Sequence, residues 1–235
     1  MTHNPRNANA FIAIMIAAGL GSISYGLSQA NVWHPYQTLA LLAIAAAASR
    51  LKIKLPGLSG NMSVNLPFLL IAVAELNLVE ALAVSCASAT LQSLPKDWTR
   101  PKVEQMLFNL ASMSLSTMLA WQVFRQGPAG NGWLLPLAAA TFFLGQTAPV
   151  ATVISLTGGG SLKKVWTDMA QLTFPYFVLS AGVASISMAA SRQVGWQIPL
   201  VALPVMFGVF RSYQMYFRTE AATEKPFTLA ARFGS

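Results

Sequence analysis

Apolar segments of nearly the length needed to cross a bilayer are the feature that most limits how this chain can fold. A transmembrane helix needs about 20 mostly apolar residues, and only 9% of the 235 residues here are charged, against about 25% in a soluble domain. The sequence therefore predicts an all-α, polytopic transmembrane helical bundle. We expect about eight helical segments, at Ala10–Ala30, Val32–Ser49, Met62–Leu76, Leu78–Leu94, Val103–Phe124, Trp133–Leu156, Met169–Ser191 and Trp196–Phe217.

The lysines and arginines predict how the bundle is oriented. Short cytoplasmic loops of membrane proteins carry an excess of both residues. If the N-terminus is cytoplasmic and all segments cross, only Arg125 and Arg192 of the 15 basic residues lie outside. We therefore expect both termini in the cytoplasm and a single integral membrane domain over residues 1–235. It divides into a cytoplasmic tail at 1–9, a helical bundle at 10–217 and a second cytoplasmic tail at 218–235.

The third and fourth segments are short, and they are joined without a glycine or proline turn. They form either two crossings or one re-entrant hairpin, which is permitted if protein surrounds it. The two alternatives give the same distribution of basic residues, so the orientation does not depend on the choice. If the hairpin is re-entrant, Glu75 and Glu80 are buried and functional. If it crosses fully, they are solvated turn residues.

Amides inside the apolar segments are the other candidates for a site. Such groups hydrogen-bond between membrane helices, or they line a small polar pocket, and both readings stay open. The candidates are Asn65, Gln92, Asn109, Gln146 and Gln171.

Little in the sequence indicates chemistry. His34 lies with Trp33 and Tyr36 at a predicted outer boundary, where aromatic residues anchor a helix at the interface, and a pH-sensing role is the alternative. Cys86 is the only cysteine, so no disulfide and no cysteine metal site is expected. We expect no catalytic residues, no metal, no cofactor and no nucleic-acid partner. The binding residues for any cofactor are unknown.

Five runs of the sequence are distinctive together. They are KIKLPGLSGNMSVNLPF (Lys52–Phe68), ELNLVEAL (Glu75–Leu82), RPKVEQMLFNLASM (Arg100–Met113), VWTDMAQLTFPYF (Val165–Phe177) and LPVMFGVFRSYQMY (Leu203–Tyr216). In this order they resemble the membrane-associated sensor (MASE-type) modules that precede diguanylate cyclase or HD-GYP phosphodiesterase domains in bacterial signalling proteins. The resemblance implies a multi-pass protein of the bacterial cytoplasmic (inner) membrane, with a cytoplasmic output after the last helix.

The end of the chain departs from that pattern, because no output-domain motif follows Phe217. We therefore expect a non-enzymatic, sensor-like membrane module that acts alone or through a cytoplasmic signalling protein. A small transporter or substrate-binding membrane subunit is one alternative, and a structural subunit of a larger membrane complex is another. The lipid bilayer is the one certain partner, and other membrane subunits are candidate partners. Cytoplasmic coupling is assigned to Arg211, Tyr213, Tyr216 and Arg218.

The orientation can be tested with introduced cysteines. Ser161→Cys lies in the loop of Lys163, and Gln193→Cys lies beside Arg192. In a Cys86→Ser background, a membrane-impermeant maleimide should label Gln193→Cys in intact cells and Ser161→Cys only in inverted membranes. Equal labelling of both positions in intact cells would contradict the predicted orientation.

Overall fold

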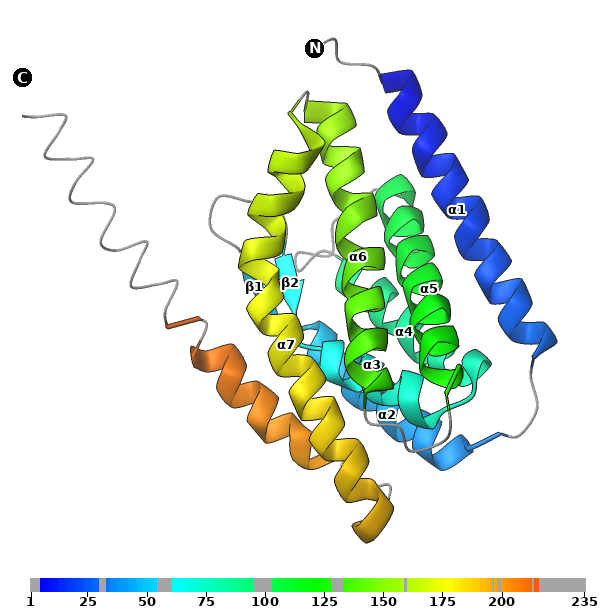
Figure 1. The fold of residues 1–235 in the computed structure, drawn as a ribbon, viewed down its shortest axis with the longest axis vertical. Helices are drawn as coiled ribbons and strands as arrows, with labels where there is room; N and C mark the ends of the chain where they lie inside the picture. The colour runs from blue at the N-terminus through cyan, green and yellow to red at the C-terminus, as the bar shows by residue number, and fades with distance from the viewer. Residues whose placement is uncertain are drawn as a thin grey trace, which may run out of the picture.

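Helices dominate the described part of the chain, in agreement with the predicted fold class. The computed structural model describes residues 5–29, 33–54, 61–94, 103–127, 133–158, 160–195, 197, 200–212 and 214–215. The helices are α1 (Pro5–Ser28), α2 (Pro35–Ser49), α3 (Leu66–Glu75), α4 (Leu78–Ser93), α5 (Val103–Arg125), α6 (Leu134–Gly158), α7 (Leu162–Val194) and a C-terminal helix (Leu200–Ser212). Figure 1 shows α5, α6 and α7 side by side, with α1 running obliquely along the outer side of α5.

Each predicted apolar segment corresponds to one of these helices. In the described residues, three of the helices are long and apolar enough to cross a membrane by themselves: α1 from Arg6, α6, and α7 as far as Gln193. The predicted number of crossings therefore remains a prediction.

A short antiparallel ladder precedes α3, and the sequence did not predict it. Strand β1 (Lys52–Lys54) pairs with β2 (Asn61–Ser63), with Ile53 opposite Met62. Met62 was expected to begin the third helix, and this boundary is wrong because its backbone is committed to the ladder. The helix begins at Leu66 instead, with Pro67 in its first turn, where a missing N–H costs nothing.

Helix α3 lies at the centre of the molecule. Ten residues of α-helix span about 15 Å, half of the roughly 30 Å hydrocarbon core, so α3 cannot cross a bilayer alone. All its residues from Leu66 to Val73 are buried, and it contacts α2, α4, α5, α6 and α7. Surrounding protein is the condition under which a membrane helix can end inside the bundle.

The bundle has two distinct ends. We call the end where α3 meets α4, at Leu76 and Asn77, the closed end. The opposite end, where α4 ends and α5 begins, is the open end. Figure 1 shows α1 and α7 both starting at one end of the molecule and both finishing at the other.

The basic residues in the described part of the chain fall into two groups, one at each end of the bundle. Arg50 and Lys52 donate to the carbonyls of Leu91 and Leu94 at the C-terminus of α4. A positive charge is favourable there, because the C-terminus is the negative end of the helix dipole. Arg125 and Arg192, the two residues predicted to lie outside, are in the last turns of α5 and α7. This grouping is the one that the charge prediction requires, although which end faces the cytoplasm stays a prediction.

Helix contacts depend on residues without bulky side chains. A methyl group on Gly19 of α1 would overlap the Cα atom of Ala111 in α5, so these two helices approach closely. Pro149 interrupts α6 and leaves the carbonyl of Gly145 without its helical donor. The hydroxyl of Ser112 in α5 donates to that carbonyl at 3.3 Å, which satisfies it inside the bundle.

Two glycines on α1 provide a matched test of this packing. Gly19→Ala should reduce the free energy of unfolding by about 1–3 kcal/mol, because a close-packed contact is overfilled. Gly21→Ala, which meets no atom within 4 Å, should be neutral or slightly stabilising. Thermal unfolding of the purified protein in one detergent measures both, and similar losses would contradict the close α1–α5 contact.

Candidate functional site: a cavity at the start of α3

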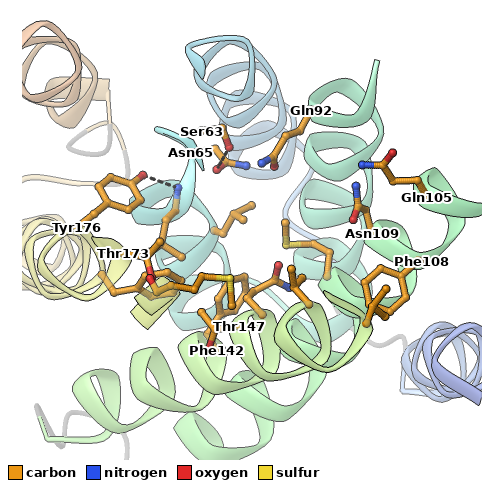
Figure 2. A pocket seen from close by; sticks show the side chains of 18 of the residues that line it. Ser63, Asn65, Gln92, Gln105, Phe108, Asn109, Phe142, Thr147, Thr173 and Tyr176 are labelled. Atoms are coloured by element: carbon orange, nitrogen blue, oxygen red, sulfur yellow. Dashed lines mark hydrogen bonds between the residues drawn. The ribbon is translucent and has the colours of Figure 1, made fainter. Parts of the chain in front are cut away.

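A cavity of about 470 Å³ lies where α3 begins, between α4, α5, α6 and α7. Four of the predicted candidate residues, far apart in the sequence, line this single space: Asn65, Gln92, Asn109 and Gln146. Figure 2 shows the side chains of Asn65, Gln92 and Asn109 around the hollow, across from those of Phe142 and Thr147. The volume is in the range of roughly 300–1,000 Å³ that is typical of small-molecule sites.

Neighbouring hydroxyl groups hold three of these amides in place. Asn65 donates to Ser88 Oγ at 2.5 Å and accepts from Ser63 at 2.7 Å. Asn109 donates to Ser93 at 3.2 Å. Gln146 is the third amide held in this way.

Gln146 of α6 donates to Ser116 Oγ at 3.1 Å. The amide nitrogens of Asn109 and Gln146 are thus both bonded to the protein. Their carbonyl oxygens accept no hydrogen bond from the residues that the structure describes. The sequence left two roles open for these amides: hydrogen bonding between helices and lining a polar pocket. Their nitrogens form hydrogen bonds between helices, and their free oxygens line the pocket.

Gln105 is a lining residue that sequence reasoning missed. It lies one helical turn before Asn109, so the two share a face of α5, and that spacing was the available signal. Gln105 is exposed and Gln92 is half-buried. Neither amide has a hydrogen-bond partner within the described residues. Together they mark the mouth of the cavity at the open end.

The wall formed by α6 and α7 is mostly apolar. Phe142 of α6 is buried, and Met169 and Phe177 of α7 line the same space. The hydroxyls of Thr147 and Thr173 donate back to their own helices. The cavity therefore presents amides on the side of α3, α4 and α5, and mostly hydrocarbon, with the single amide of Gln146, on the side of α6 and α7.

Tyr176 of α7 connects the cavity to α3. Its ring is buried and lines the cavity, and its hydroxyl accepts from the Leu66 N–H at 3.3 Å. The N–H groups of Phe68 and Leu69 donate to the Asn65 carbonyl, and Pro67 has no N–H. Every backbone donor in the first turn of α3 is thereby satisfied or absent.

The closed end contains the two candidate acids, in different environments. Glu80 is fully buried and accepts from the backbone N–H groups of His34 and Asn77, the second bond completing the capping box of α4. His34 Nδ1 lies 3.4 Å from Glu80 Oε2. Glu75 is half-buried and accepts from the Ser191 hydroxyl of α7. Neither acid lines the cavity, and neither is a freely solvated turn residue.

Two side chains of α5 satisfy the other end of α3. Trp121 Nε1 and Arg125 both donate to the Leu76 carbonyl, at 3.2 and 3.0 Å. The Arg125 guanidinium also lies over the Trp121 ring, 5.3 Å from its centroid. A cation at this position interacts favourably with the negative, C-terminal end of the α3 dipole.

The remaining candidates lie elsewhere. Gln171 is on the exposed face of α7, outside the cavity. Arg211 is exposed at the end of the C-terminal helix, while Tyr213, Tyr216 and Arg218 lie outside the described residues. Within the described part of the chain, no group of three His, Cys, Asp or Glu residues is placed to bind a metal.

Comparison with known proteins identifies the family. The MASE9 family model matches residues 11–218, which is most of the chain. This chain is a member of the MASE9 family. MASE9 is a family of membrane-associated sensor modules, so the resemblance stated from the sequence is confirmed and the chain is a membrane protein. No curated protein and no solved structure matches it.

The two acids of this MASE9 module provide a matched pair of substitutions. Glu80→Gln replaces one of two buried acceptor oxygens with an NH₂ group that faces an N–H, so we expect a loss of about 1–3 kcal/mol in unfolding free energy. Glu75→Gln retains an oxygen that can accept from Ser191, so its effect should be below about 1 kcal/mol. Thermal unfolding in detergent tests this order, and an equal or larger loss for Glu75→Gln would contradict it.

Proposed function

We propose that this MASE9 module is a receptor of the bacterial inner membrane whose signal is a small molecule bound in the cavity. The observation that supports this most directly is the convergence of four helices and Asn65 on one hollow whose amide groups have unused hydrogen-bonding capacity. Gln92, Asn109 and Gln146 are half-buried, so their free groups are accessible from inside the cavity. In a pocket of this size they can bind a ligand as well as support packing.

The position of the cavity suggests where the ligand comes from. Its mouth is at the open end, beside the exposed Gln105 at the start of α5. Arg50 and Lys52 are at the same end of the bundle, on the side that the positive-inside rule places in the cytoplasm. The ligand would accordingly enter from the cytoplasm or the inner leaflet.

Tyr176 supplies a route from the cavity to the rest of the protein. It contacts the cavity and α3 together, and it shares one hydrophobic core with Met206 and Phe210 of the C-terminal helix. Gly195, at φ 116°, ends α7 before the chain turns back into that helix. A ligand that shifts Tyr176 would bias the position of the C-terminal helix (Leu200–Ser212), and this change would be the signal to a cytoplasmic partner. In this function the module acts by binding its ligand and carries out no catalytic step.

A transporter is the second candidate, and one observation favours it. Transporters place their substrate beside helices that break off within the membrane, and α3 begins beside the cavity. Flux measurements in proteoliposomes distinguish the two functions. A receptor binds its ligand without net movement across the bilayer, whereas a transporter accumulates it.

Receptor function can be tested with a cavity-blocking substitution. Val150 lines the cavity from α6 and Leu144, on the same helix, is 50% exposed on the outer face. Val150→Trp should fill the cavity, and Leu144→Trp should leave it open. Each protein is purified from its native membranes, and its organic extract is analysed by mass spectrometry.

We expect one or more small molecules to co-purify with the wild type and with Leu144→Trp, and to fall by about tenfold or more with Val150→Trp, the change that a loss of about 1.4 kcal/mol in binding produces. Val150→Trp must keep a thermal transition similar to that of Leu144→Trp for the comparison to hold. If Val150→Trp unfolds, Val150→Phe takes its place. Identical extracts from all folded variants would refute the receptor function.

A further inference from the structure

We infer that the cavity takes an uncharged amphiphile, a molecule with a hydrogen-bonding head and an apolar body, and this rests on the proposed receptor function. The head would lie against the amides of Gln92 and Asn109, and the body against Phe142, Met169 and Phe177. Both walls belong to the described part of the chain, so the orientation follows from named residues.

The described lining residues disfavour a ligand that carries a net charge. Every described side chain that lines the cavity is neutral. An ion that leaves water for such a site gains no opposite charge to offset the loss of its hydration. At the open end, Arg50 and Lys52 donate to the carbonyls of Leu91 and Leu94, and neither lines the cavity. At the closed end, Glu80 and Arg125 are bonded to backbone groups and do not line it either.

The start of α3 does not provide an anion site either. Helix N-termini bind anions through free backbone N–H groups. Here the Leu66 N–H is bonded to Tyr176, the next two donors are bonded to the Asn65 carbonyl, and Pro67 has none. No donor in this turn is left for a carboxylate or a phosphate.

The free polar groups match a neutral head. The oxygens of Asn109 and Gln146 can accept hydrogen bonds, and the whole Gln92 amide can both donate and accept. A primary amide or a hydroxyl group offers the same two functions. The apolar wall opposite can then receive a chain or a ring, which gains free energy by leaving water.

Three probes with one alkyl chain and different heads test the inference: decanamide, decanoate and decyltrimethylammonium. The reporter is Met113→Cys in a Cys86→Ser background, because Met113 lines the cavity and is 7% exposed. The rate of its reaction with N-ethylmaleimide is measured in lipid nanodiscs at alkaline pH, where decanoate stays ionised. Ile186→Cys, at a position 72% exposed on α7, reports any effect of the probes on the membrane itself.

Decanamide should protect Met113→Cys at a concentration about tenfold or more below that of either charged probe, and it should not slow labelling of Ile186→Cys. Adding Gln92→Leu should remove most of this preference. Gln171→Leu is the matched control, since Gln171 is the same residue type in an apolar segment but faces outward from α7. It should leave the preference unchanged.

The failures of the two proposals are distinguishable. Protection by decanoate or decyltrimethylammonium equal to that by decanamide, or protection by none of the three, overturns the ligand class. A charged phospholipid as the only molecule that co-purifies would also overturn the ligand class, while receptor function would stand. If Val150→Trp reduces the amount of no co-purifying molecule, the receptor function itself is overturned.

Discussion

The structure depends on how a short helix ends inside an apolar bundle. Helix α3 has ten residues, and those from Leu66 to Val73 are buried, so the backbone groups at its ends need partners within the protein. Unpaired groups of this kind are costly in a low-dielectric interior. Side chains of two long helices contribute at both ends: Tyr176 of α7 accepts from the Leu66 N–H, and Trp121 and Arg125 of α5 donate to the Leu76 carbonyl.

The cavity is connected to this arrangement. Because α3 begins part-way through the bundle, the space beyond its first turn is bounded by α4, α5, α6 and α7. The β1–β2 ladder and the Ser63–Asn65–Ser88 hydrogen bonds border that space on the side of α3. Tyr176 therefore belongs to the wall of the cavity and to the support of α3, so a ligand that displaced it would disturb both.

The two ends of the bundle differ in their chemistry. At the closed end, Glu80, Glu75 and Arg125 each bond to another element, so residues from α2, α3, α4, α5 and α7 are tied together there. At the open end, Gln92 and Gln105 have no partner among the described residues. A receptor that holds one end fixed and leaves binding groups available at the other can transmit a change in shape along α7. Family membership establishes the sensor class, and this contrast supports the mechanism proposed for it.

The sequence by itself determined the positions of the helices, since apolar length alone decides where a membrane helix fits; α4 and α5 begin at Leu78 and Val103, as predicted. It also indicated amide residues in apolar segments, but not their partners. Gln146 and Gln171 looked equivalent, and only the packing turned the first toward a cavity and the second outward. Similarly, the sequence could not show whether Glu75 and Glu80 differ in burial. In the structure, the capping box and the backbone N–H of His34 bond to Glu80 and not to Glu75. The ladder at Met62 was missed because strand pairing is a contact between distant segments. Helix positions follow from local composition, while the site follows from which faces meet, and that is settled only when the whole bundle packs.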